Sequence, residues 1–159
     1  MEKIVNRWKS ERNNTKKTKT LFKQVSNLGN QKHKLAEATH NEVFEEVNCL
    51  KCANCCKSIP PIVSQRDIKR ISSHLNLSKT TFSDKYLITD NDGDTVINAS
   101  PCPFLMEDNA CSIYEQRPSA CRLYPHSGEE QFFKNLNLHK TNIQYCPALF
   151  EIIKRLGSL

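Results

Sequence analysis

Eight cysteines constrain this chain of 159 residues more than any other feature of its sequence. Four of them fall within eight residues, as Cys-x2-Cys-x2-Cys-Cys, and the other four are spread over the second half of the chain. Adjacent thiolates, such as those of Cys55 and Cys56, repel each other unless a cation neutralises them. Thiolates select zinc, iron–sulfur clusters or Cu(I). The sequence therefore predicts a set of metal ligands: Cys49, Cys52, Cys55, Cys56, Cys102, Cys111, Cys121 and Cys146.

The alternative for a cysteine-rich chain is a disulfide framework, which is typical of secreted domains. The N-terminus is charged and polar (MEKIVNRWKSERNN) and lacks the apolar stretch of a signal peptide. No run of the sequence approaches the ~20 apolar residues that a membrane-spanning helix needs. We therefore expect a cytoplasmic protein without a membrane segment, in which the thiols are kept reduced.

Positive charge is concentrated at the start of the chain. Residues 1–40 hold ten Lys or Arg and three Glu, a net charge of +7, whereas the remainder holds thirteen basic and fourteen acidic residues, a net charge of −1. Such a basic arm can bind nucleic acid or an acidic partner, or it can be a solvated helix face. Trp8 is its only aromatic before Phe22, and no nucleic-acid-binding motif is present. The sequence therefore argues against nucleic acid and leaves an unknown protein partner open.

Hydrophobic spacing predicts a mainly α fold. Residues 2–28 fit a helix with a break near 13–15, and residues 31–47 fit a helix that leads to the first cysteine. Ser64 begins a capping box, and Ser78 is the expected cap of a helix that ends near residue 86. An Asp-Gly pair between two strand-like runs, 86–89 and 95–98, predicts a hairpin.

We therefore expect a small, mainly α protein with a loop-rich metal-binding cysteine core and a short β-hairpin. Residues 1–45 would form a basic helical N-terminal arm, and residues 46–159 a cysteine-cluster metal-binding domain. The two cysteine segments should share their site or sites, because Cys102, Cys111 and Cys121 are too far apart in sequence to form a local knuckle.

The second cysteine segment is rich in proline. Residues 101–125 interleave three cysteines with four prolines, and proline restricts the loops that aim metal ligands. Cys102 and Cys146 are each followed by proline, as is the last cysteine of bacterial ferredoxin runs. Arg117 and Arg122 flank Cys121. Three interpretations are open: they stabilise anionic sulfur through charge-assisted hydrogen bonds, they bind an acidic ligand, or they are ordinary surface residues.

These segments together resemble the zinc- or iron-chelating CxxCxxCC family over about residues 49–147. The resemblance rests on five motifs: Cys49-Leu-Lys-Cys52-Ala-Asn-Cys55-Cys56, Pro101-Cys102-Pro103-Phe104-Leu105, Cys111-Ser112-Ile113-Tyr114, Arg117-Pro118-x2-Cys121-Arg122 and Cys146-Pro147. One departure is Ala53, which stands where many members have glycine. The resemblance implies metal binding. One branch is similar to the flagellin lysine N-methylase, although this chain has only four glycines and no glycine-rich cofactor loop.

Two metals fit this ligand set. Zinc would occupy two closed sites of four thiolates, and iron would form one or two cysteine-ligated clusters. The spacing in 49–56 is tighter than that of paired zinc knuckles and favours an iron–sulfur cluster. We therefore predict a cytosolic protein that coordinates zinc or an iron–sulfur cluster through eight cysteines. The alternatives are a protein lysine N-methylase-like enzyme and a structural metal module that recruits a partner; catalytic residues are not predicted.

Overall fold

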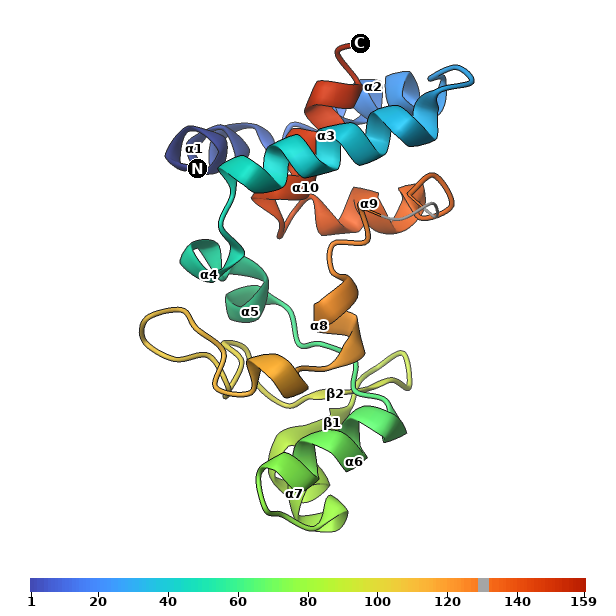
Figure 1. Ribbon diagram of the computed structural model, residues 1–159. Coiled ribbons are helices and arrows are strands. Elements are labelled where there is room, and N and C mark those ends of the chain that lie inside the picture. Colours follow the sequence, from blue (N-terminus) through green and yellow to red (C-terminus); the bar gives the residue numbers. More distant parts are fainter. Residues whose placement is uncertain (129–131) are drawn as a thin grey trace. The chain divides into compact units, whose positions relative to one another are not determined.

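The computed structural model describes residues 1–128 and 132–159 (Figure 1). The chain forms two compact units. Unit 1 consists of Met1–Asn48 and Pro125–Leu159, and unit 2 consists of Cys49–Tyr124. The mainly α class with a two-stranded hairpin is confirmed. The predicted division into an arm of residues 1–45 and a domain of residues 46–159 stays a prediction.

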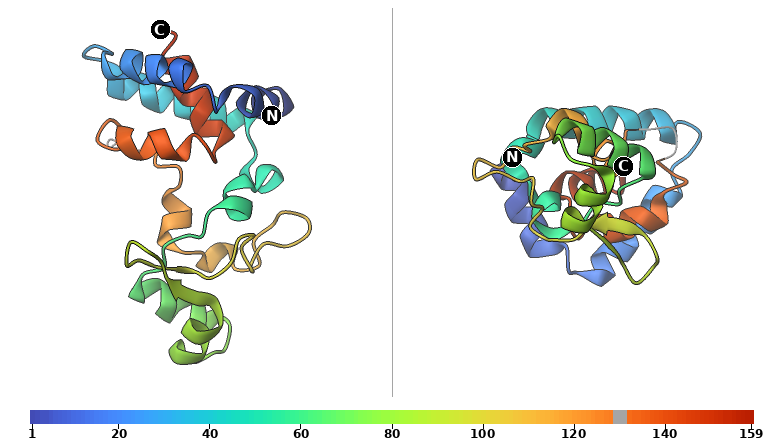
Figure 2. Two further views of the ribbon diagram at one scale, coloured as in Figure 1. Left: turned by 180° about the vertical axis from the view of Figure 1, so that it is seen from behind. Right: turned by 90° about the horizontal axis from the view of Figure 1, so that it is seen from below.

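Unit 1 is built around its last helix, α10. Three helices from the N-terminal segment pack against α10, and Figure 2 shows them from behind and from below. The helices of unit 1 are α1 (Glu2–Glu11), α2 (Thr15–Ser26), α3 (Lys32–Glu46), α9 (Leu136–Asn142) and α10 (Pro147–Leu156). The predicted break lies between α1 and α2, where the Asn14 side chain caps α2 by accepting a hydrogen bond of 3.0 Å from the Lys17 amide.

The position of α10 follows from its composition. Six of its apolar side chains are at most 1% exposed: Ala148, Leu149, Phe150, Ile152, Ile153 and Leu156. A helix that is apolar on nearly all sides has to be covered by other helices. On the helices that cover it, the buried residues include Ile4 and Trp8 of α1 and Val25 of α2. Ile4 and Trp8 are four residues apart and so lie on one face of α1.

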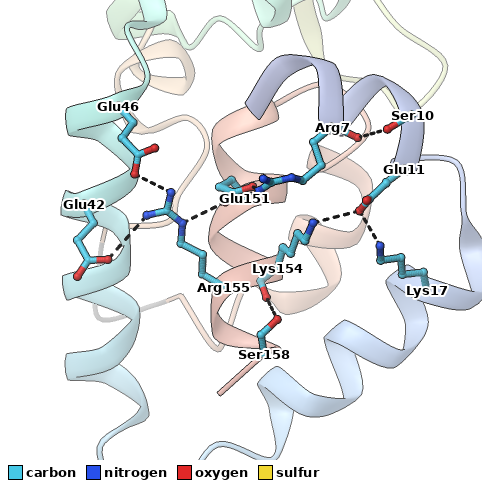
Figure 3. Close-up of polar contacts among 10 residues, drawn as sticks. All are labelled: Arg7, Ser10, Glu11, Lys17, Glu42, Glu46, Glu151, Lys154, Arg155 and Ser158. Atoms are coloured by element: carbon cyan, nitrogen blue, oxygen red, sulfur yellow. Dashed lines mark hydrogen bonds and ion pairs between the residues drawn. The ribbon is translucent and has the colours of Figure 1, made fainter. Parts of the chain in front are cut away.

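A buried ion pair connects α1 to α10 (Figure 3). Glu151 of α10 is only 3% exposed, and both of its carboxylate oxygens accept hydrogen bonds from Nη1 of Arg7, at 2.9 and 2.8 Å. Arg155 donates to Glu151 at 3.1 Å and to Glu46 of α3 at 2.6 Å. A buried carboxylate is stable only when it is paired in this way. Part of the positive charge of the N-terminal segment therefore serves internal contacts.

The predicted hairpin of unit 2 follows helices α6 and α7. Helix α6 (Gln65–His74) packs against α7 (Lys79–Tyr86), which leads into strand β1 (Leu87–Thr89) and, after the turn, strand β2 (Thr95–Ile97). The strands are antiparallel, with Leu87 opposite Ile97. In the turn, the Asp90 carboxylate accepts hydrogen bonds from the amides of Asp92 and Asp94, and Gly93 has a φ of 86°.

Helices α6 and α7 begin at the predicted caps. Ser64 Oγ accepts a hydrogen bond of 3.2 Å from the Asp67 amide, and the Asp67 carboxylate accepts one of 3.0 Å from the Ser64 amide. Ser78 Oγ accepts a hydrogen bond of 3.0 Å from the Thr81 amide. Each cap satisfies an amide that the first turn of a helix leaves without a partner.

The core of unit 2 supports the second cysteine segment. It consists of Val63, Ile68, Ile71, Phe82, Ile97, Phe104 and Ile113. The Tyr86 ring lies 4.9 Å from the Phe104 ring, measured between centroids. Cys102 and Cys111 pack against this core. Across the described ranges of both units, every helix is too short or too polar to span a membrane.

Candidate metal centre

The first four cysteines lie on two short helices, α4 (Cys49–Cys52) and α5 (Asn54–Ser58). We expected a loop here, but the structure is helical. Within α4 the three-residue spacing of Cys49 and Cys52 is compatible with one helical turn, and Cys55 and Cys56 lie on the next helix. Two rigid helical turns hold the four thiols closer to a fixed arrangement than a loop would.

Ala53 separates the two helices. Its φ of 46° and ψ of 18° place it in the left-handed region, which costs about 1–2 kcal/mol for a residue with a Cβ atom. Its amide donates to the Cys49 carbonyl at 2.8 Å, and its carbonyl accepts from the Lys57 amide at 3.1 Å. The reversal at Ala53 thus ends α4 and starts α5 without leaving its own backbone groups unpaired. The left-handed conformation also gives a physical reason for the glycine that many members of the resembled family have at this position.

The second segment joins the first through the backbone of Cys102. The Cys102 amide donates a hydrogen bond of 2.8 Å to the Cys56 carbonyl. Cys111 forms an isolated antiparallel bridge with Leu105, which brings it back beside the Cys102 loop. Cys121 lies on the short helix α8 (Ser119–Leu123). Seven of the eight predicted ligands therefore belong to unit 2, and they come from both segments.

The pKa shifts show that thiols from the two segments are electrostatic neighbours. Burial is the largest of the effects that raise the pKa of Cys121 to about 12, and the nearby Cys56, Cys102 and Cys111 add to it. Burial also raises the pKa of Cys102 to about 11, with contributions from Cys56 and Cys111. Such thiols stay protonated unless a cation stabilises their thiolates. The cluster formed by Cys56, Cys102, Cys111 and Cys121 therefore consists of electrostatic neighbours whose thiolates a cation would stabilise.

Cys56 is the member of this cluster that ionises most readily. A hydrogen bond from the Cys55 thiol, with the two sulfurs 4.0 Å apart, lowers the pKa of Cys56 to about 7 against the opposing effect of burial. Burial raises the pKa of Cys49, and Cys52 and Cys56 raise it further. Cys56 thus raises the pKa of a thiol on α4 and of thiols in the second segment. It is therefore the cysteine that links the two segments electrostatically.

The two arginines that flank Cys121 differ in their surroundings. The Arg117 guanidinium lies 3.8 Å from the centre of the Tyr114 ring and donates a hydrogen bond to the Tyr114 carbonyl. Its charge lowers the pKa of Cys111 and Cys121, in part offsetting burial. Arg122 is exposed and donates to the Glu115 carbonyl. The charge of Arg117 therefore favours the anionic form of Cys111 and Cys121, whereas its hydrogen bond goes to a backbone carbonyl.

A buried carboxylate that sequence reasoning did not connect to the site anchors α8. Asp67, which is 1% exposed, accepts hydrogen bonds at Oδ1 from the Ser119 amide at 3.1 Å and the Ser119 hydroxyl at 3.0 Å. Arg70 donates to the same oxygen at 2.7 Å and to the Arg117 carbonyl at 2.9 Å. Burial by itself would raise the pKa of Asp67, but hydrogen bonds from Ser64, Arg70 and Ser119 lower it to about 2. This contact fixes the start of the helix that carries Cys121.

Cys146 belongs to unit 1. It is buried at the N-terminus of α10, where its Sγ accepts a hydrogen bond of 3.4 Å from the Leu149 amide. A cysteine in this position performs the role of an N-cap. Its predicted role as a metal ligand stays a prediction.

The donor set fits a soft metal by its chemistry. The seven cysteines of unit 2 supply thiols, which suit zinc and iron–sulfur clusters and not hard cations. In the parts of the chain that the structure describes, no three His, Cys, Asp or Glu side chains are arranged so that they could hold one metal ion. Coordination would therefore draw the sulfurs closer together, and structural metals bind with enough free energy, about 10–16 kcal/mol in small zinc peptides, to drive such a change.

Comparison with known proteins supports this assignment. Residues 48–147 match the family CxxCxxCC, described as "Putative zinc- or iron-chelating domain". The chain belongs to the CxxCxxCC family. The matched range contains both cysteine segments and ends at Pro147, so it includes all eight cysteines.

A curated relative of this CxxCxxCC protein occurs in an archaeon. It is "Uncharacterized protein MJ0661" of Methanocaldococcus jannaschii, which is 29% identical over 107 residues. The match covers 65% of this chain and 58% of the relative, so the chain spans less than two thirds of the relative's length. No solved structure matches the chain.

Proposed function

We propose that this protein is a cytoplasmic metal-binding protein that holds an iron–sulfur cluster, or alternatively zinc, through the thiolates of unit 2. The observation that carries the proposal is the meeting of the two cysteine segments at Cys56, which bonds to the Cys102 backbone and opposes ionisation of Cys102, Cys111 and Cys121. Membership of a family described as zinc- or iron-chelating supports the same conclusion.

The choice of iron–sulfur over zinc rests on the close spacing of Cys49, Cys52, Cys55 and Cys56. When bound, a cluster of this kind would supply electron transfer, and a closed zinc site would supply stability. In either case the protein contributes the fixed helical turns, the positive charge of Arg117 near Cys111 and Cys121, and the anchoring of α8 by Asp67.

Serine substitutions test the proposal, because serine removes the soft ligand and changes the side-chain size little. We expect Cys56→Ser and Cys121→Ser, each purified without oxygen, to lose most of the bound metal. Cys121→Ser should also increase amide hydrogen exchange in residues 49–56, because the two segments share the site.

Cys146→Ser is the matched variant in unit 1. Serine is a good N-cap, so this change keeps the hydrogen bond to the Leu149 amide and removes only the thiol. A loss of metal would identify Cys146 as a further ligand, and retention would limit the site to unit 2. Full metal content in both Cys56→Ser and Cys121→Ser would contradict the proposal.

A further inference from the structure

A groove runs between α2 and α9 within unit 1 and has a volume of about 600 Å³. Apolar side chains line its floor, among them Phe22 of α2 and Leu136 and Ile143 of the α9 segment. Lysines lie along its edges: Lys19 and Lys23 on α2 and Lys140 on α9. All three lysines are exposed. The groove therefore combines an apolar floor with a basic rim.

Contacts among the residues that the structure describes leave the charge of this rim unused. Of the described residues that line the groove none is acidic, and neither α2 nor α9 contains an acidic residue. Among the described residues, Lys19 and Lys23 have no ion-pair partner, and Lys140 donates only to Asn137 on its own helix. In contrast, Lys17, which is also on α2, forms an ion pair of 2.8 Å with Glu11. The positive charge that internal contacts leave unpaired is thus concentrated beside an apolar depression.

An amphipathic helix with acidic flanks matches both properties of the groove. Its apolar stripe would cover the floor and its carboxylates would face the lysines, as in other helix-in-groove complexes. Helix α2 has 12 residues, which corresponds to a length of ~18 Å, so an occupant of about three turns would follow the whole groove. A nucleic acid would pair with the lysines but leave the apolar floor without a partner.

We propose that this groove binds an acidic amphipathic helix of a partner protein. The surface belongs to unit 1, so this inference goes beyond metal binding and does not depend on it. The lysines set the sign and orientation of the bound helix, and the floor supplies its apolar contact area. Through this interaction the protein would bind partners that carry an acidic amphipathic helix.

Designed peptides and the full-length protein provide the test. The probe is a small panel of labelled three-turn helical peptides with Leu or Phe on one face and Glu on its flanks, measured by fluorescence anisotropy. The reference is a set of peptides of the same composition in which the apolar residues are scattered around the helix. We expect the ordered peptides to bind at least about tenfold more tightly than the scattered ones, because only the former can place apolar side chains on the floor.

Two charge-reversal variants locate the site. Lys19→Glu with Lys23→Glu should weaken binding at least about tenfold, since like charges then face each other across the groove. Lys3→Glu with Lys9→Glu is the matched control: both residues are exposed on α1, do not line the groove, and include one lysine in the last turn of a helix, as the first pair does. The control should change affinity by less than about twofold. Circular dichroism confirms that both double variants keep their helices.

Three results would overturn the inference. The first is equal binding of ordered and scattered peptides, or no measurable binding of either. The second is equal weakening by the two double variants, which would assign binding to overall charge. The third is stronger, groove-dependent binding of a short DNA duplex or of vesicles containing phosphatidylserine, which would assign the groove to another class of partner.

Discussion

At the scale of single residues, Ala53 carries a backbone conformation that glycine adopts without strain. Ala53→Gly should therefore leave the free energy of unfolding within about 1 kcal/mol of the wild-type value or raise it. Relief of the left-handed conformation is worth about 1–2 kcal/mol. It offsets the entropy cost of glycine, about 0.5–1 kcal/mol, and the lost burial of a methyl group, ~0.8 kcal/mol.

The control for this prediction is Ala120→Gly, which places glycine inside α8 next to another cysteine. This variant should lose about 1 kcal/mol, the usual helix penalty of glycine relative to alanine. Urea unfolding of the metal-loaded proteins without oxygen measures both values. Equal losses at the two positions would show that the conformation of Ala53 is not strained.

Single residues also show how far the sequence can predict the site. The caps at Ser64 and Ser78 are predictable because donor and acceptor lie within three residues. The candidate ligands can be identified because few residue types other than cysteine bind soft metals. The contact between Asp67 and Ser119 spans 52 residues, and no local pattern indicates it, because the capping box already accounts for the aspartate.

At the scale of elements, Asp67 connects α6 to α8 and so connects the core of unit 2 to Cys121. Asp67→Ala removes the capping box of α6 and leaves Arg70 and the start of α8 without their shared acceptor. We expect unit 2 to lose roughly 2–4 kcal/mol of unfolding free energy. Amide hydrogen exchange should increase in residues 117–121, where the anchored segment lies.

Asp84→Ala is the matched control, since Asp84 is an exposed aspartate on α7. It should change the unfolding free energy by no more than about 0.5 kcal/mol. If Asp67→Ala were as mild as the control, the hydrogen bonds of Asp67 would not anchor α8.

Helix α10 is one of the elements that the sequence analysis did not predict. Its signals are present: Pro147 stands at the first helical position, and Leu149, Phe150, Ile153 and Leu156 repeat at helical spacing. Ile4 and Trp8 of α1 and Val25 of α2 are buried, and which helix they cover depends on long-range packing. Periodicity identifies a buried face without identifying its partner.

At the scale of the whole molecule, the chain returns at Pro125 to complete the unit that its first 48 residues began. Sequence position alone could not predict this, because the two segments of unit 1 are separated by the entire cysteine unit. Their association depends on burial of α10, and the stability of the protein should therefore respond to charge placed within unit 1.

His139 provides such a charge when the pH falls. Its side chain is fully buried, 4.7 Å from the Phe132 ring between centroids, and burial, together with nearby His126, lowers its pKa from 6.5 to about 4. The stability that depends on neutral His139 is complete above the unfolded-state pKa of 6.5 and is lost as the pH falls toward 4, because the unfolded state binds the proton first. We expect a loss of about 2 kcal/mol between pH 7.5 and pH 5.

Urea unfolding of the wild type and His139→Leu at these two pH values measures this effect. Relative to the wild type, the variant should gain about 2 kcal/mol on acidification, because leucine cannot bind the proton. His74→Leu, at an exposed histidine of α6, should show no such gain. Parallel pH profiles of the wild type and His139→Leu would contradict the prediction.

The metal content and the thiol state of the native protein test the central claim most directly. The wild-type chain should be purified without oxygen and then measured for zinc, iron and acid-labile sulfide, for visible absorption, and for thiols that react before and after denaturation with a chelator. The account predicts stoichiometric iron with sulfide and a charge-transfer spectrum, or else stoichiometric zinc, with few reactive thiols until the metal is removed. Protein that contains no metal and has all of its cysteines freely reactive or paired in disulfides would contradict the account.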